Sequence, residues 1–158
     1  MDKCIKICPP NLLWKLYVVV GRQLVLSGYP SIARKIMQRA YQLVPVKSRH
    51  AVILDYSKTE YIAKHINCSM ALLNHGILRF PSEWKLLLER IQQLVLNQHY
   101  TQALLLNIDA LKMHVGAGRL WSQYIHIVHQ YVNHSFNQSI TLEAHYLTIS
   151  LTISFNHS

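Results

Sequence analysis

Ala33-Arg-Lys-Ile-Met-Gln-Arg-Ala40 is the stretch that decides the predicted fold. It places two small residues seven positions apart, and Pro45 follows five residues after the second. The same template fits twice more along the chain without gaps. These further copies are Ser69, Gly76 and Pro81, and then Ala103, Ala110 and Val115. Self-similarity at a fixed period of about 20–50 residues is the signature of a repeat architecture, in which each copy is one supersecondary unit.

Each copy is preceded by a stretch in which two large side chains lie three residues apart, and a fourth such stretch follows the last copy. The pairs are Trp14 and Tyr17, Ile53 and Tyr56, Trp84 and Leu87, and Trp121 and Tyr124. This spacing puts both side chains on one helical face. Small residues seven apart lie on one stripe of a helix and let a neighbour approach closely. Each repeat is therefore predicted to be a helical hairpin that packs against the next one.

Turn-forming residues separate the predicted helices. Residues 28–30, Gly-Tyr-Pro, are expected to end the first helix, and Ser31 to cap the second. Ser82 is the corresponding cap expected for the fifth helix. Further turns are expected at residues 67–69, 97–99 and 116–118, and helices at residues 50–65 and 119–134.

A Trp-x-x-Tyr helix followed by an Ala-x6-Ala helix and a proline resembles the half-a-TPR (HAT) repeat, over roughly residues 12–134. Tyr56-Ser-Lys-Thr-Glu60 reproduces the Tyr-x-x-x-Glu of that pattern, whose glutamate is structural. The chain departs from the pattern where the glutamate is expected, at Gly21, Ile91 and Val128, and where the proline is expected, at Val115.

The resemblance implies an all-α, tetratricopeptide-like (HAT-type) α-solenoid of antiparallel helix pairs, with about three hairpins plus one further helix. A generic tetratricopeptide-like stack and another type of helical bundle are the alternatives. The residues predicted to pack the repeats are Trp14, Tyr17, Ala33, Ala40, Tyr56, Trp84, Ala103, Ala110, Trp121 and Tyr124.

The chain has 158 residues, of which 51% are hydrophobic and 15% charged, so one folded domain is expected. Residues 1–11 are predicted to form an N-terminal extension, and residues 12–134 the helical-repeat domain. Residues 135–158 are predicted to form an irregular or strand-like tail outside the repeat pattern, because apolar and polar residues alternate from Tyr146 to Phe155. We expect the chain to be part of a longer solenoid.

The sequence contains only weak patterns for a metal, cofactor or catalytic site. His126 and His129 share a helical face but have no third ligand at a matching spacing, and Cys4 and Cys8 have no second pair. Gly116-Ala-Gly118-Arg119 lacks the third glycine of a dinucleotide site. Acidic residues are few and scattered, which disfavours acid/base catalysis. The sequence therefore predicts no enzyme, no metal, no cofactor and no small-molecule substrate.

Basic residues outnumber acidic ones by 16 to 7, giving a formal net charge of +9. The densest basic stretch, with no acidic residue between positions 31 and 50, contains Arg34, Lys35, Arg39, Lys47 and Arg49. Such a patch can contact RNA phosphates or an acidic stretch of a partner protein, or it can be an ordinary solvated face.

We predict a non-catalytic protein-interaction scaffold, with protein partners. If the HAT resemblance holds, it implies RNA processing, in which the chain is a fragment of a larger factor. The alternative is a direct RNA-binding module that uses the basic patch at residues 34–49. Lys15 and Arg22 interrupt the N-terminal apolar stretch, unlike a membrane-spanning segment. The apolar helix faces are needed for repeat packing, so no attachment to a membrane surface is expected either. An odd number of cysteines favours an intracellular protein, nuclear if the HAT resemblance holds and cytoplasmic otherwise.

Overall fold

The computed structural model describes residues 9–135, and this part of the chain is helical without any strand. A short 3-10 helix, η1 (Pro10–Leu12), leads into the first α-helix, and a second one, η2 (Val46–Ser48), precedes α4. The α-helices are α2 (Leu13–Leu26), α3 (Pro30–Leu43), α4 (Arg49–Ile62), α5 (Ile66–Arg79), α6 (Trp84–Leu96) and α7 (Tyr100–Met113), followed by a last helix at residues 118–135. The predicted all-α series of paired helices is confirmed.

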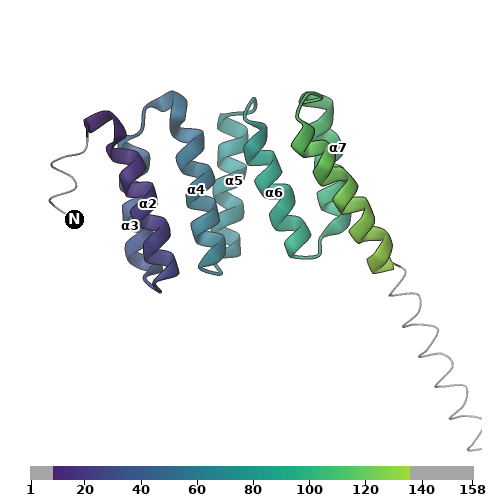
Figure 1. Cartoon of the computed structure of the whole chain (residues 1–158), viewed down its shortest axis with the longest axis horizontal. Coiled ribbons are helices and arrows are strands. Elements are labelled where there is room, and N and C mark those ends of the chain that lie inside the picture. The colour runs from purple at the N-terminus through teal and green to yellow at the C-terminus, as the bar shows by residue number, and fades with distance from the viewer. Residues whose placement is uncertain (1–8, 136–158) are drawn as a thin grey trace, which may run out of the picture. The chain divides into compact units, whose positions relative to one another are not determined.

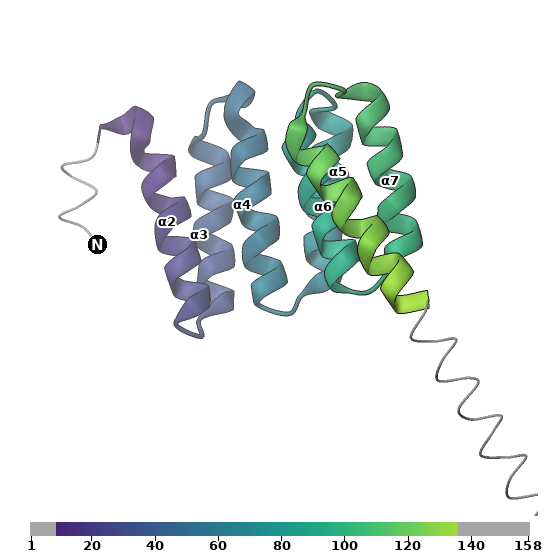
Figure 2. The ribbon, with the colours of Figure 1, turned by 45° about the vertical axis from the view of Figure 1, so that its right-hand side comes forward.

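The described part of the chain divides after Arg90 into two compact units, and each is described by itself. In the first unit, α2 packs along α3 and α4 packs along α5, while α3 and α2 also contact α4 (Figures 1 and 2). The second unit contains the end of α6, all of α7 and the last helix. Each pair is joined by a turn of three residues, which makes its two helices antiparallel.

The three turns that join the pairs have the same backbone geometry. Each contains one residue in the left-handed region, and these residues are Gly28 (φ 85°), Lys64 (φ 65°) and Gln98 (φ 63°). In each turn the next backbone amide donates to the carbonyl five positions back, in the pairs Tyr29–Leu24 (2.8 Å), His65–Glu60 (2.9 Å) and His99–Leu94 (2.9 Å). This is the Schellman arrangement that ends many helices. Each left-handed residue lies five positions before the first small residue of a template copy. The backbone turns therefore recur in step with the sequence template.

These turns set a register that differs from the one predicted for the first helix of each pair. The residues that lie eleven positions before the left-handed residue of each turn are equivalent, and these are Tyr17, Ile53 and Leu87. The sequence pattern instead matches Ile53 to Trp14. Glu60 is equivalent to Leu24 and Leu94, and not to Gly21 as predicted. The sequence pattern matches residues by the size of their side chains. In the structure, the distance from the turn fixes a residue's position along the helix.

Three predicted boundaries are corrected by the structure. The helix α3 begins at Pro30 after Tyr29, so Ser31 lies inside it and is not the cap. The helix α6 begins at Trp84, which leaves Ser82 one position too early to cap it. The helix α5 begins at Ile66, so the predicted turn at residues 67–69 is helical, because Lys64 takes the left-handed conformation that ends α4. The predicted turn at residues 97–99 is confirmed.

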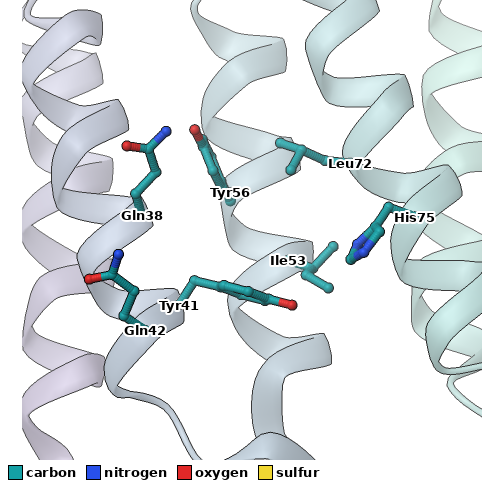
Figure 3. Close-up of a pocket in the computed structure, with 7 residues that line it drawn as sticks. All are labelled: Gln38, Tyr41, Gln42, Ile53, Tyr56, Leu72 and His75. Carbon is teal, nitrogen blue, oxygen red and sulfur yellow. The ribbon is translucent and has the colours of Figure 1, made fainter.

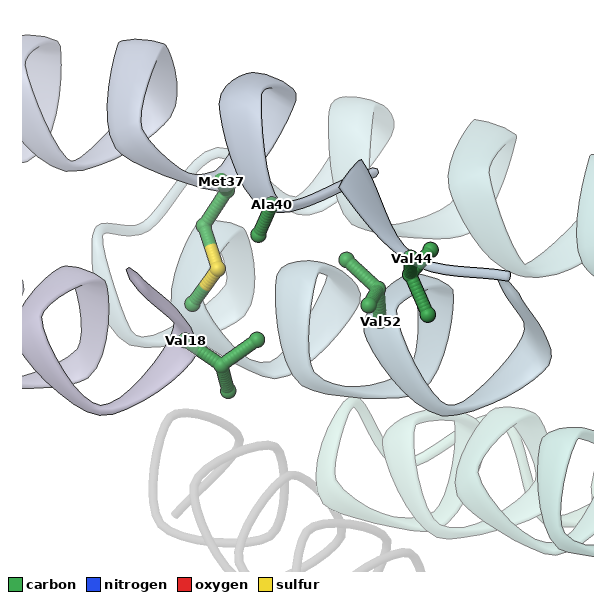
Figure 4. Close-up of a cluster of buried hydrophobic side chains, with 5 residues drawn as sticks. All are labelled: Val18, Met37, Ala40, Val44 and Val52. Carbon is green, nitrogen blue, oxygen red and sulfur yellow. The ribbon is translucent and has the colours of Figure 1, made fainter. Parts of the chain in front are cut away.

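The small residues of the repeat template lie in the core. Their exposed fractions are Ala33 1%, Ala40 0%, Ser69 0%, Ala103 0% and Ala110 0%, and Gly76 is also buried. Around Ala40, the buried side chains of Val18, Met37, Val44 and Val52 form one cluster (Figure 4). Ile53, Leu73 and Leu86 form a second buried cluster in the same unit. Burial of such side chains is the main stabilising term of a fold of this kind.

One repeat position carries a polar residue where its equivalents are apolar. Four residues after the first small residue of each template copy lie Met37, Leu73 and Asn107, and all three have an exposed fraction of 0%. Within the part of the chain that the structure describes, neither amide atom of Asn107 has a hydrogen-bond partner. A buried polar group without a partner costs about 1–3 kcal/mol.

Replacing Asn107 by Leu is therefore expected to raise the free energy of unfolding by about 1–3 kcal/mol, because it removes that cost and adds apolar burial. Urea unfolding followed by circular dichroism measures the change. Asn74→Leu, at an exposed position of α5, is the matched control and should change stability by less than about 0.5 kcal/mol. A less stable Asn107→Leu variant would show that the amide is satisfied in solution.

The last helix buries one face and exposes another. Leu120 and Ile127 have exposed fractions of 0%, whereas Trp121 is 47%, Ile125 68% and Val132 57% exposed. A shallow hollow between α7 and this helix is lined by Leu111 and Trp121, among other residues. The predicted strand-like segment, Tyr146 to Phe155, lies outside the described residues.

Candidate functional site

Three neighbouring helices of the first unit line a groove. The side chains of Gln38, Tyr41 and Gln42 come from α3, those of Ile53 and Tyr56 from α4, and those of Leu72 and His75 from α5. Figure 3 shows the glutamines on one side and Leu72 and His75 on the other, with Ile53 between them. The groove encloses about 280 Å³ and is mainly apolar. We call it the α3–α5 groove.

Helical spacing brings these side chains together. Gln38, Tyr41 and Gln42 lie three and four positions apart, and so share one face of α3. Tyr41 packs against both buried clusters of the unit, which fixes its ring in the wall of the groove. Ile53, with an exposed fraction of 2%, belongs to the second cluster. The walls of the groove are therefore extensions of the core.

Tyr56 adds a hydroxyl group to this apolar surface. Burial raises the pKa of its phenol, and the nearby Glu60 carboxylate adds to the effect. Its ordinary pKa is already 10, so the phenol is neutral at physiological pH. A neutral phenol both donates and accepts a hydrogen bond.

The helices on the two sides of the groove carry no acidic residue. Neither α3 nor α5 contains Asp or Glu, and the two acidic residues of α4 are both engaged in ion pairs. Asp55 pairs with Arg22, and Glu60 pairs with Arg34. Each carboxylate of these three helices is therefore matched by an arginine.

Arg34 and Glu60 form a clamp between α3 and α4. The guanidinium donates two hydrogen bonds of 2.7 Å to the two carboxylate oxygens, which is a bidentate pair. The His65 Nδ1 atom lies 3.0 Å from the same carboxylate and 3.1 Å from the guanidinium. The Glu60 side chain is 5% exposed and that of Arg34 is 39% exposed. The clamp joins the first hairpin to the second.

The charges in this clamp stabilise each other. Burial opposes the charged form of Glu60, but the hydrogen bonds and the charge of Arg34, with a smaller contribution from His65, hold its pKa below the usual range. The hydrogen bonds to Glu60 and its charge raise the pKa of Arg34. Both groups are therefore charged at physiological pH.

The structure separates the five residues of the predicted basic patch. Arg34 is held by Glu60, while Lys35 and Lys47 are exposed. Arg39 is exposed and donates a 3.1 Å hydrogen bond to Gln42, which lines the groove. The guanidinium of Arg49 lies 5.1 Å from the ring centre of Tyr41, a second groove residue. Only Arg39 and Arg49 are thus connected to the groove by a contact.

The predicted repeat-packing residues occupy different environments. Ala33, Ala40, Ala103 and Ala110 are buried, whereas the large side chains are half-buried or exposed. Half-buried are Trp14, Tyr17, Tyr56, Trp84 and Tyr124, and Trp121 is exposed. Trp14, Tyr17 and Tyr56 pack against the first buried cluster. Sequence analysis missed the groove itself, because Leu72 and His75 belong to no motif.

Residues 9–135 lack two further kinds of site. These residues contain no group of three or more His, Cys, Asp or Glu side chains placed to hold a metal ion. Their helices include none that is both long enough and apolar enough to cross a membrane.

Comparison with family models gives a match between residues 1–146 and the TPR-like domain of PRP6. The chain belongs to this PRP6 TPR-like family. The match spans every helix that the structure describes, which confirms the predicted HAT or tetratricopeptide-like resemblance and the α-solenoid fold class. No curated protein and no solved structure gave a match. In this PRP6 TPR-like domain, the α3–α5 groove is the candidate functional site.

Proposed function

We propose that the chain is a non-catalytic protein-interaction scaffold. Paired-helix solenoids present extended surfaces on which partner proteins bind. The observation that carries the proposal is the α3–α5 groove, a mainly apolar hollow with fixed walls on a PRP6 TPR-like domain. A few residues seated in well-packed, desolvated pockets supply most of the binding energy of many interfaces.

The family match supports a role in RNA processing. PRP6 is a splicing factor, so we propose that the chain acts in the nucleus, within a splicing-related assembly. In that setting its contribution would be to hold protein components together.

Direct RNA binding remains the alternative prediction, and the structure offers it little support. Arg34, the first residue of the basic patch, is engaged by Glu60. Strongly salt-dependent binding to the nucleic-acid backbone involves many phosphate contacts, about 6–10 in one representative case. Lys35, Arg39 and Lys47 are the exposed cations that remain in the patch.

The proposal is tested by affinity capture with the whole chain as bait. The bait is first shown to be folded by circular dichroism and is then incubated with nuclear extract treated with nuclease. We expect a reproducible set of proteins that beads carrying only the tag do not capture. If proteins are captured only from a parallel extract that has not been treated with nuclease, or if a folded bait captures no protein, the scaffold proposal is wrong.

A further inference from the structure

We propose that the α3–α5 groove binds an acidic segment of a partner protein, anchored by one aliphatic or aromatic side chain. The inference rests on the proposed scaffold function and specifies the chemistry of the partner. It is carried by three features of the groove: its size and apolar lining, its polar rim, and the charge around it.

The groove lies at the lower end of the size range of binding sites. Small-molecule sites typically enclose about 300–1,000 Å³, and this groove encloses about 280 Å³. Its apolar surface comes from Ile53, Leu72 and the rings of Tyr41 and Tyr56. Burying one Leu or Phe side chain in such a site contributes about 1.5–3 kcal/mol. The lining therefore favours one apolar anchor.

The rim of the groove can bind peptide backbone. Gln38 and Gln42 are exposed on one side, and an amide side chain offers both donors and an acceptor. They lie four residues apart on α3, one helical turn, and Figure 3 shows their amides on the same side of the groove. Gln38 has a hydrogen bond with Tyr56 and the Gln42 oxygen accepts one from Arg39, and the amide groups that these bonds leave over can pair with extended backbone beside the anchor.

The charge around the groove selects an acidic segment. Arg39 uses one nitrogen on Gln42, and a guanidinium has five N–H donors in all, so others remain for a carboxylate. Arg49 places a second guanidinium against the ring of Tyr41. Because α3 and α5 have no acidic residue and the two of α4 are each paired with an arginine, a partner carboxylate meets the two guanidinium groups, with only the partly compensated charge of Glu60 opposing it.

A protein segment fits these features better than RNA does. Two guanidinium groups contact the groove residues, whereas backbone recognition of nucleic acid uses many phosphate contacts. Arg49 also lies over the ring of Tyr41, which leaves less of that ring for a base to stack on.

Fluorescence anisotropy with a labelled probe tests the inference on the whole chain. The probe is the peptide Asp-Glu-Asp-Leu-Phe-Glu-Asp with an N-terminal fluorescein. Two control peptides replace either the Leu-Phe pair by Ala-Ala or every acidic residue by Lys. We expect saturable binding of the probe, at least tenfold weaker binding of the Ala-Ala peptide, and no saturable binding of the Lys peptide.

Three variants locate the binding. Arg39→Glu reverses a charge at the rim, and Leu72→Ser removes part of the apolar wall; each should weaken probe binding at least tenfold. Lys85→Glu, at an exposed position of α6, makes the same charge change away from the groove residues and should alter binding less than twofold. Circular dichroism must show that all three variants remain folded, and a variant that unfolds is replaced by Arg39→Ala or Leu72→Ala.

Two results would overturn the inference. One is probe binding that is equal in the wild type and both groove variants. The other is a single-stranded RNA oligonucleotide that binds more tightly than the probe and is weakened by the same variants. If the probe fails while nuclease-treated extract still yields captured proteins, the groove assignment is wrong and the scaffold proposal stands. Failure of both experiments would remove the scaffold proposal as well.

Discussion

Replacing Arg34 by Met is expected to lower the free energy of unfolding by about 3 kcal/mol. The substitution removes the two 2.7 Å hydrogen bonds to a carboxylate whose side chain is only 5% exposed. Removing one partner of a buried ion pair leaves an uncompensated charge, which typically costs about 3–5 kcal/mol. The partial exposure of Arg34 places the expected loss at the lower end. Urea unfolding followed by circular dichroism measures it.

Two controls separate the ion pair from other effects. Lys35→Met removes the adjacent, exposed positive charge and should change stability by less than about 0.5 kcal/mol. The double variant Arg34→Met with Glu60→Leu removes both charges and should recover most of the lost stability. If Arg34→Met is as stable as the wild type, Arg34 is not paired with Glu60 in solution and is again a candidate residue for contact with a partner.

The same clamp makes stability depend on pH. Although burial opposes the charged form, Arg34 holds the pKa of Glu60 below its ordinary value of 4.5, so the folded state favours the carboxylate. The stabilisation is fully present above pH 4.5 and is lost as the pH falls through the lower, folded-state pKa. In Arg34→Met only the smaller contribution of His65 still opposes the burial of Glu60, so the loss of stability in acid is expected to be smaller than in the wild type. Parallel pH titrations of unfolding distinguish the two slopes.

Replacing Gly76 by Leu is expected to lower the free energy of unfolding by about 3 kcal/mol, at the upper end of the usual cost of overpacking. A Cβ atom at this position would lie 2.9 Å from Cγ2 of Ile53 and 3.2 Å from Cδ1 of Leu86. Both neighbours belong to the second buried cluster, and the β-branched Ile53 has little rotamer freedom. Even Gly76→Ala should therefore be destabilising, by about 1 kcal/mol. Thermal and urea unfolding measure both changes.

Gly21 is the matched control, because its Cβ would also meet a neighbour at 2.9 Å but that neighbour is the flexible end of Met37. Methionine adapts to irregular space, and Ala is favoured over Gly inside a helix by about 0.5–1 kcal/mol. Gly21→Ala should thus be neutral or stabilising. Equal losses for Gly21→Ala and Gly76→Ala would contradict the packing described for the two helix pairs.

The repeat template could be predicted from the sequence because it depends on spacing alone. Ala33 and Ala40 lie two turns apart on one stripe, and any helix with that spacing has a stripe that a neighbour can approach closely. The equivalence of Ile53 with Tyr17 could not be predicted in this way. It depends on where the turn falls, and the left-handed residue is a glycine in the first turn but Lys64 in the second. A lysine gives no sequence signal for a turn.

The candidate site was harder to predict than the fold. The ion pair of Arg34 joins residues 26 positions apart, so a charge count over residues 31–50 could not show that its partner was Glu60. The groove depends on faces of three helices at once, and Leu72 and His75 have ordinary helical surroundings in the sequence. Only the packed helices show that these side chains face Tyr41.

Site-specific photocrosslinking tests most directly whether proteins bind at the groove. A photoreactive amino acid is placed at His75, in the groove, or at His129, an exposed control position on the last helix, and each folded chain is irradiated in nuclease-treated nuclear extract. The account predicts protein adducts from position 75 that mass spectrometry maps to acidic segments containing an apolar residue, with few adducts from position 129. Equal yields from both positions, or adducts dominated by RNA in extract not treated with nuclease, would contradict it.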